Sequence, residues 1–241
     1  MRNKPKTISP AGSADAQPRR RFMKNVFQQE MDHLKGRLLS MSAHVEENLS
    51  GAVRAYLENN TELALQVDAN DTTVDNMEVE IEEECLKIMA LHQPVAVDLR
   101  FLAAVLRINN ELERVSDQAV NICEEVTPGR DDIPRHEDHK ISLMASKARF
   151  MLKNSLDAFV NGDIKLAYDV CGMDDEVDSL NDEIGELVIT AIEHAPGHTR
   201  HLLHALRTAR SLERVADLAT NIAEMVIYIN KGEIVRHKLE S

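Results

Sequence analysis

Apolar side chains recur every three or four residues along most of this chain, a spacing that places them on one face of an α-helix. The first such run extends from Phe27 to Tyr56. The second ends before Pro94, because proline cannot continue the hydrogen-bond ladder of a helix. The third, from Phe101 to Val126, alternates steps of four and three, as helical bundles do. The pattern therefore predicts three long helices in the first half.

The same pattern returns in the second half, where it predicts helices at 139–160, 164–193 and 199–230. The sequence itself also repeats: across 102–126 and 202–226, at an offset of 100, 13 of 25 positions are identical. A repeat of about a hundred residues with three helices in each copy is typical of two structurally equivalent units. We therefore predict an all-α fold of two tandem, sequence-related three-helix bundles.

The stretches between the helical runs set the predicted domain boundaries. The start of the chain holds three prolines and almost no apolar residues, which is typical of a disordered tail. A stretch rich in Pro, Gly and charge follows the third helix and is interpreted as a linker. The prediction is a disordered basic tail (1–22), a first three-helix bundle (23–127), a linker (128–138) and a second three-helix bundle (139–241).

Charge is unevenly distributed along the chain. The formal net charge is -13. Residues 1–24 carry seven Lys and Arg against one Asp, a net of +6, so the remainder carries -19. Such an acidic body is expected to repel nucleic acid and to attract cations or basic partner surfaces. No run approaches 18 continuous apolar residues, so we expect no insertion into a membrane.

The sequence offers little that points to catalysis. It lacks the GxxxxGK, GxGxxG and GxSxG motifs of nucleotide-binding proteins and hydrolases, and no nucleophile stands with a base. The three cysteines are odd in number and form no CxxC pair, which favours buried, reduced thiols. We therefore predict that the protein is not an enzyme.

Acidic residues four apart occur at matched places in both repeats. Residues at this spacing lie one turn apart on one helix face, where like charges destabilise a helix by ~0.2–0.5 kcal/mol per pair. A cation would relieve that repulsion, and carboxylate-only clusters suit hard cations such as Mg, Mn, Ca or iron. The second-helix acids can turn toward the third helix, so each bundle could gather four carboxylates. The candidate metal ligands are Asp71, Asp75, Glu113 and Asp117 in the first repeat and Asp174, Asp178, Glu213 and Asp217 in the second.

Other interpretations of these residues stay open. A solvated acidic face that was copied by duplication would show the same pattern. The acids of the third helices also point away from the core, so a metal site there would be shallow. A histidine cluster near the last helix has the spacing for Zn or Ni, but the first repeat lacks it, which favours an exposed helix start; it comprises His194, His198, His201 and His204. A di-iron bundle needs two ExxH motifs on different helices, and only Glu30–His33 matches.

Several motifs resemble those of the PhoU family. In the first half they are Gln93-Pro94, Asp98-Leu99-Arg100, Leu112–Asp117 and Asn121-Ile122; in the second they are Ser211–Asp217, Asn221-Ile222 and Lys231-Gly232. The resemblance covers roughly 24–238. It implies two three-helix bundles in a cytoplasmic protein, with the E/DxxxD acids as sites for divalent or ferric ions (Mg, Mn, Fe or Zn). The second half has His198 in place of Asp98, which leaves a shared role for that position in doubt.

The resemblance also implies a function. It implies a homodimer that negatively regulates phosphate uptake as an adaptor between a phosphate ABC transporter ATPase and a membrane sensor histidine kinase. The alternative from the acids alone is a helical protein that buffers or stores metal. A third possibility is a plain scaffold whose acids only keep it in solution.

Overall fold

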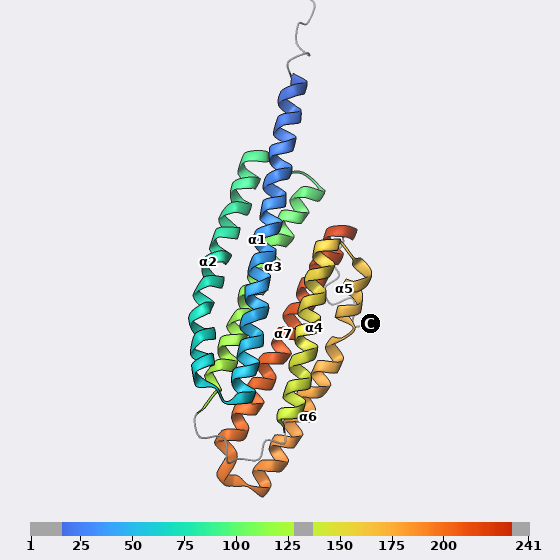
Figure 1. The fold of residues 1–241 in the computed structure, drawn as a ribbon. Helices are drawn as coiled ribbons and strands as arrows, with labels where there is room; N and C mark the ends of the chain where they lie inside the picture. Colours follow the sequence, from blue (N-terminus) through green and yellow to red (C-terminus); the bar gives the residue numbers. More distant parts are fainter. Residues whose placement is uncertain (1–15, 128–136, 233–241) are drawn as a thin grey trace, which may run out of the picture.

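The computed structural model describes residues 16–127 and 137–232, and every regular element within them is a helix (Figure 1). The all-α prediction is confirmed. The helices are α1 (Ala16–Glu58), α2 (Thr61–His92), α3 (Val97–Glu124), α4 (Asp138–Asn161), α5 (Ile164–Cys171), α6 (Asp174–His194), the short 3-10 helix η1 (Pro196–His198) and α7 (Thr199–Lys231).

The turn that follows the first helix is built in the same way in both halves. Asn60 and Asp163 each accept a hydrogen bond through the side-chain oxygen from a backbone N–H three residues later, at 3.0 Å, and so cap α2 and α5. The residues before them, Asn59 and Gly162, have φ values of 55° and 63°, a region that Asn and Gly tolerate best. The two halves therefore share even the conformation of this turn, and equivalent residues are 103 positions apart.

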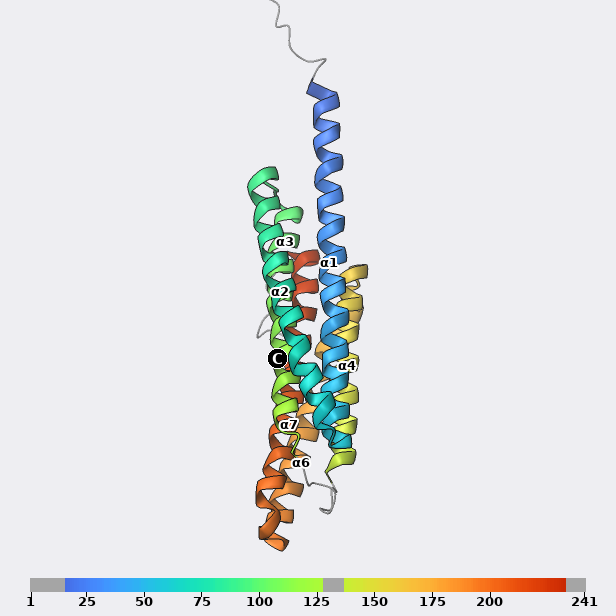
Figure 2. The same ribbon diagram turned by 60° about the vertical axis from the view of Figure 1, so that its left-hand side comes forward.

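The two bundles lie side by side and run in opposite directions (Figures 1 and 2). Helices α1–α3 form the first bundle and α4–α7 the second, so the α2–α3 and α6–α7 turns lie at opposite ends of the molecule. Helix α7 packs against α4, α5 and α6 on one side and against α3 on the other. The cores of the two bundles contain fully buried side chains, among them Leu34, Tyr56, Leu112, Ile122, Leu212 and Ile222.

Specific contacts join the two bundles. The rings of Phe101 on α3 and Phe159 on α4 stack with centroids 5.6 Å apart. The Asn221 side-chain amide on α7 donates to the Glu111 carboxylate on α3 at 3.4 Å. His204 on α7 pairs with Glu125, which follows α3 directly. These contacts combine apolar packing with polar pairs, so the interface between bundles has the character of a core.

The first helix begins earlier than the sequence predicts. Residues 16–22 belong to α1, so the assignment of 1–22 to a disordered tail was wrong for its last seven positions. Pro18 does not prevent this, because it stands in the first turn, where a backbone N–H has no helical partner. Residues 1–15, like 128–136 of the predicted linker, lie outside the described residues, and α4 already begins at Asp138.

The predicted helix 164–193 is two helices. Helix α5 ends at Cys171 and α6 begins at Asp174, whereas α2 continues unbroken through the equivalent place in the first bundle. Gly172 stands where α2 has Ala69, and glycine is about 1 kcal/mol less favourable in a helix interior. Three consecutive acids then favour a new helix start, because negative charge stabilises a helix N-terminus.

The thiols agree with the expectation of buried cysteines. Cys85 and Cys123 are buried and Cys171 is half-buried, and all three are free. Burial raises the pKa of each thiol to about 12, so all three stay protonated at neutral pH. Among the described residues, no helix is both long and apolar enough to span a bilayer.

Candidate functional site

The structure brings the predicted acids together along two seams between neighbouring helices. Helices α2 and α3 pack side by side in the first bundle, as α6 and α7 do in the second. We call the line of acids between α2 and α3 the first seam: Asp71, Asp75, Glu113 and Asp117. The line between α6 and α7 is the second seam: Asp174, Asp178, Glu213 and Asp217.

The seams are shallow, as the sequence pattern led us to expect. Asp117 and Asp217 are exposed, whereas Glu113 and Glu213 are half-buried. On α3 and α7 these acids occupy the edge of the apolar face, next to buried positions such as Val115. A ligand bound along a seam would therefore remain open to solvent on one side.

Carboxylates repel one another across the first seam. Partial burial raises the pKa of Asp71, and the charges of Asp75 and Asp117 raise it further. The pKa of Glu113 is raised by burial and then by Asp117, Glu78 and Asp75. Asp71 and Glu113 thus each sense acids on their own helix and on the facing helix, so a bound cation would relieve repulsion from both sides.

A short hydrogen-bond chain supports one acid of the first seam. The Ser116 hydroxyl donates to Asp71 Oδ1 at 2.6 Å and accepts from the Asn48 amide at 3.2 Å. Asn48 and Ser116 are buried, so the chain links α1, α3 and α2 beneath the surface. This bond favours the charged form of Asp71 and lowers its pKa against the effect of burial.

The second seam lacks that support. Ala216 stands where the first bundle has Ser116, and Met151 stands where it has Asn48. The equivalent acid, Asp174, keeps a buried Oδ1 without a hydrogen-bond partner. Burial, then the charges of Asp217 and Asp178, raise the pKa of Asp174 from 3.8 to about 6. The two seams therefore have equivalent carboxylates, but the second seam lacks the hydrogen-bond donors that support Asp71 in the first.

Several residues at the seams were not predicted from the sequence. Glu78 on α2 adds a fifth carboxylate to the first seam. Burial and nearby acids raise the pKa of Glu213, and a hydrogen bond from Asn181, the counterpart of Glu78, partly offsets that rise. Burial and a neighbouring acid raise the pKa of Asp117 and of Asp217, and the charge of Arg114 on α3 opposes the rise at both, so Arg114 lies near both seams. Comparing the two repeats residue by residue would have shown that Asn181 replaces Glu78 and that Ala216 replaces Ser116. It would not have shown that Arg114 lies between the bundles.

The carboxylate oxygens of the two seams are of the kind that a hard cation binds, but in this structure they are not arranged around a common point. In the part of the chain that the structure describes, no three His, Cys, Asp or Glu side chains stand in an arrangement that would hold a metal ion. The carboxylates and the unpartnered Asp174 oxygen are the groups that such a cation binds. Metal binding at the eight predicted ligands therefore stays a prediction, and it would require their side chains to turn inward.

Two of the four histidines near the start of α7 bind groups outside the histidine cluster. The His194 ring bonds the backbone carbonyl of Thr190 at 2.7 Å, and His204 pairs with Glu125. His201 is buried, with its ring centroid 6.2 Å from that of His204. The sequence pattern favoured an exposed helix start here, and the burial of His201 shows that this was only partly right.

The unsupported acid leads to a prediction about stability. The pKa of Asp174 is higher in the folded chain than in the unfolded chain, so its charge destabilises the fold above pH 6 and costs little near pH 4. Asp174→Asn should stabilise the metal-free protein at pH 7 by about 1 kcal/mol, a value reduced for solvent screening at this half-exposed site. Urea unfolding in chelator at pH 7 and pH 4 measures the difference, which should shrink at the lower pH.

The matched control for this prediction is Asp71→Asn. The Ser116 hydroxyl already satisfies Asp71, so removing its charge should increase stability less than removing that of Asp174. A loss of stability in Asp174→Asn at pH 7 without metal would show that the charge is compensated in the fold.

Comparison with known proteins agrees with this architecture. The family model described as "PhoU domain" matches twice, at residues 38–126 and 141–226. The phosphate-specific transport system accessory protein PhoU of Serratia marcescens is 35% identical over 213 residues, covering 88% of this chain and 87% of that protein. The PhoU homolog of Aquifex aeolicus is 34% identical over 209 residues, covering 87% and 95%.

Solved structures show the same fold. The crystal structure of PhoU from Pseudomonas aeruginosa has a TM-score of 0.83 at 31% identity and covers 86% of this chain and 100% of that chain. The phosphate transport system regulatory protein PhoU from Streptococcus pneumoniae has a TM-score of 0.79 at 24% identity. The two domain matches fall on the two bundles, in order and over most of their length, and the chain belongs to the PhoU family.

Proposed function

We propose that this chain is a regulatory accessory protein of phosphate transport that acts by binding partners rather than by catalysis. The observation that supports this most directly is the pair of PhoU domain matches, together with relatives that are named as accessory proteins of the phosphate-specific transport system. The family resemblance supplies the finer proposal: a negative regulator in the cytoplasm that connects the ATPase of a phosphate ABC transporter with a membrane sensor histidine kinase.

The surface of the protein suits such a role. Its body is strongly acidic, so basic partner surfaces should bind fastest and their binding should weaken with salt. The two similar bundles lie side by side, with their helices running in opposite directions. One molecule can therefore contact two partners, or two copies of one partner, which raises the overall affinity without new chemistry.

We further propose that the two seams bind divalent or ferric ions. The support is the raised pKa of facing carboxylates on both seams and the unpartnered oxygen of Asp174. A bound cation would neutralise the repulsion and hold α2 against α3 and α6 against α7. The chain's own residues orient the ligands: Ser116 holds Asp71, and Asn181 holds Glu213.

A gene deletion tests the regulatory proposal. In a strain without this protein, a phosphate-responsive reporter should stay switched on when phosphate is plentiful, and a plasmid copy should restore repression. Normal repression in the deletion strain would contradict the adaptor role and leave metal buffering as the better explanation. Elemental analysis of the purified protein tests metal binding separately, so the two proposals fail independently.

A further inference from the structure

One end of the molecule combines an exposed apolar turn with a projecting helix (Figures 1 and 2). The turn joins α2 to α3 and carries four large apolar side chains that face water, with exposures of 60%, 73%, 57% and 45% at Leu91, Val95, Val97 and Leu99. Residues 91–97 include no Asp, Glu, Lys or Arg. Four such side chains within nine residues form an apolar surface of the kind that marks a binding site.

Helix α1 projects past this turn. The ring centroid of His92, the last residue of α2, lies 5.1 Å from that of Phe27 on α1, and His92 also pairs with Glu30. Helix α2 therefore ends level with Phe27, and residues 16–26 of α1 extend about 16 Å beyond it, at 1.5 Å per residue (Figure 2). Helix α4 begins at the equivalent of Lys35, so the second bundle has no such projection.

The projecting part of α1 is basic and amphipathic in sequence. Residues 16–24 hold four basic residues and no acidic one, namely Arg19, Arg20, Arg21 and Lys24. The helical period places Phe22 and Val26 on one side of α1 and Arg21 and Lys24 on the opposite side. A helix with basic residues on one face and apolar residues on the other is typical of segments that lie on an anionic membrane surface.

The shared fold requires neither feature. The α6–α7 turn, equivalent to the α2–α3 turn, has smaller or polar residues where the first bundle has Val95, Val97 and Leu99: Ala195, Gly197 and Thr199. A turn at this place in a bundle therefore forms without large apolar side chains. The apolar turn and the projecting helix are additions to the first bundle, both at the same end of the molecule.

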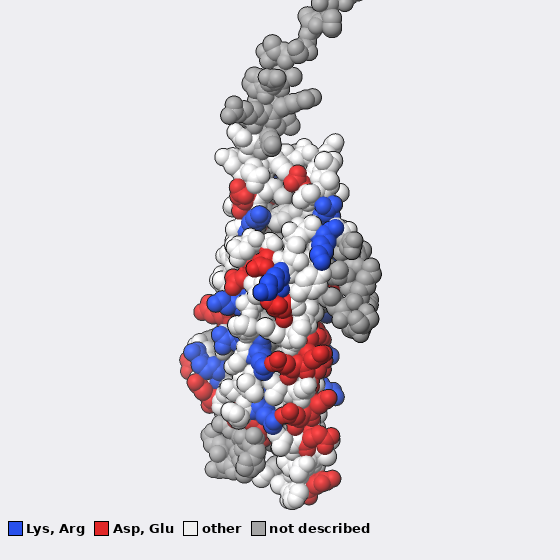
Figure 3. Space-filling model, turned by 90° about the vertical axis from the view of Figure 1, so that its right-hand side faces the viewer, with Lys and Arg blue, Asp and Glu red and all other residues white. Residues whose placement is uncertain are grey.

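The distribution of charge favours the same end for contact with an anionic surface. Residues 1–24 carry a net of +6 and the remainder -19. On the face shown in Figure 3, a column of acidic side chains runs along the half of the molecule that lies away from the start of α1. An anionic surface would therefore attract the α1 end and repel the rest of the body, which orients the molecule on that surface.

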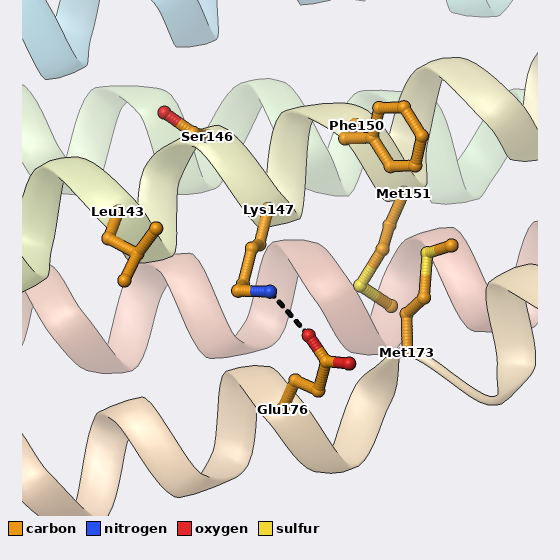
Figure 4. Close-up of a pocket in the computed structure, with 7 residues that line it drawn as sticks. All are labelled: Leu143, Ser146, Lys147, Phe150, Met151, Met173 and Glu176. Atoms are coloured by element: carbon orange, nitrogen blue, oxygen red, sulfur yellow. Dashed lines mark hydrogen bonds and ion pairs between the residues drawn. The ribbon is translucent and has the colours of Figure 1, made fainter.

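A second exposed apolar surface provides a comparison. Phe150, 54% exposed, and Leu143, 43% exposed, lie beside an apolar pocket of about 330 Å³ between α4 and α6 (Figure 4). Lys147 at this pocket forms an ion pair with Glu176, so its charge is already balanced. The residues that line the pocket are thus apolar without a net positive charge, and they serve as the control for the apolar turn.

We propose that this end of the molecule, formed by residues 16–26 and the α2–α3 turn, binds the surface of an anionic lipid bilayer. A bilayer presents negative phosphate groups on the outside and apolar chains just beneath them, so one partner satisfies both the basic helix and the apolar turn. An apolar anchor and a basic patch together hold a protein at a membrane more stably than either does alone. This inference rests on neither the regulatory role nor the metal sites.

Co-sedimentation of the full chain with lipid vesicles tests the proposal. The protein should bind vesicles of phosphatidylcholine mixed with phosphatidylglycerol, should bind phosphatidylcholine alone at least about tenfold more weakly, and should be released by salt. Val95→Glu with Val97→Glu should raise the lipid concentration needed for half-maximal binding at least about tenfold. Leu143→Glu with Phe150→Glu makes the same change in charge on the comparison surface and should leave that concentration unchanged.

The basic residues of α1 are tested in the same assay. Arg20→Gln, Arg21→Gln and Lys24→Gln together remove three charges and should weaken binding to the mixed vesicles at least about tenfold. The control removes three exposed basic residues elsewhere in the chain and should bind as the wild type does: Arg54→Gln, Lys153→Gln and Arg210→Gln. Far-UV circular dichroism checks that all variants are folded.

A fluorescence measurement locates the contact on the molecule. The chain contains no Trp, so Val95→Trp introduces a single reporter on the turn. Its emission should shift to the blue when mixed vesicles are added, because the indole ring leaves water. Leu65→Trp is the control, since Leu65 is 64% exposed at the opposite end of α2 and should show no shift.

Three results would overturn the proposal. The first is a wild type that does not bind the mixed vesicles at low salt, which would point to an acidic protein as the partner of this end. The second is equal binding by the Val95→Glu, Val97→Glu variant and its control. The third is an unshifted emission of the Val95→Trp variant on vesicles to which it is bound.

Discussion

Asp117→Asn together with Asp217→Asn is expected to abolish most metal binding while the protein stays folded. Each substitution removes one charged ligand from a seam, and an amide keeps the shape of the side chain without the charge that a hard cation needs. We expect the affinity for Mn²⁺ to fall at least about tenfold at each seam, equivalent to about 1.4 kcal/mol. Titration calorimetry and elemental analysis of the folded double variant measure the change.

A control with the same change in charge separates ligation from bulk electrostatics. Glu62 and Asp169 are exposed acids that lie outside both seams, so Glu62→Gln with Asp169→Asn should keep wild-type affinity. Equal metal content in the seam variant and the wild type would remove the seams as metal sites. Equal losses in the seam variant and the control would assign the effect to net charge.

Leu112→Ala and Leu212→Ala are each expected to lower the free energy of unfolding by about 3 kcal/mol. Both side chains are fully buried at equivalent places of the repeat, one on α3 and one on α7. Each substitution leaves a cavity in a packed core, for which losses of about 2–5 kcal/mol are typical. For a chain of this size, the melting temperature should fall by roughly 6–12 °C.

Leu86→Ala is the control for these core variants. Leu86 is 53% exposed, so its truncation should change stability by less than about 0.5 kcal/mol. Urea unfolding of the three variants, each against the wild type, measures the differences. Losses below 1 kcal/mol at 112 or 212 would show that the core around them is looser than its burial indicates.

Most of the helices follow directly from the sequence, because each buries one apolar stripe and local signals end it. The proline after α2 is such a signal, and α2 ends before it as expected. The matched caps at Asn60 and Asp163 are local signals of the same kind, which the structure showed. The break at Gly172 was missed, because the apolar period continues through it. The start of α1 was missed because an early proline suggested a tail, although the first turn of a helix accepts proline.

The carboxylates of the candidate site could be predicted from the sequence, but the residues that hydrogen-bond or crowd them could not. Spacing along one helix places Glu113 and Asp117 on one face, and the repeat doubles the pattern. Ser116 donates a hydrogen bond to Asp71, whereas Asp174 has a buried oxygen without a donor. Both facts depend on which side chains the neighbouring helix presents. Periodicity along a single helix contains no information about the facing helix, so these differences required the packed structure.

The position of α7 between the two bundles determines how the molecule should unfold. A duplicated sequence suggests two halves that fold alone, yet α7 buries one side against its own bundle and another against α3. A half-chain that ends before α4 would expose the apolar and polar surface with which α3 meets α7. We therefore expect the two repeats to unfold as one cooperative unit, because loosening either half removes packing from the other.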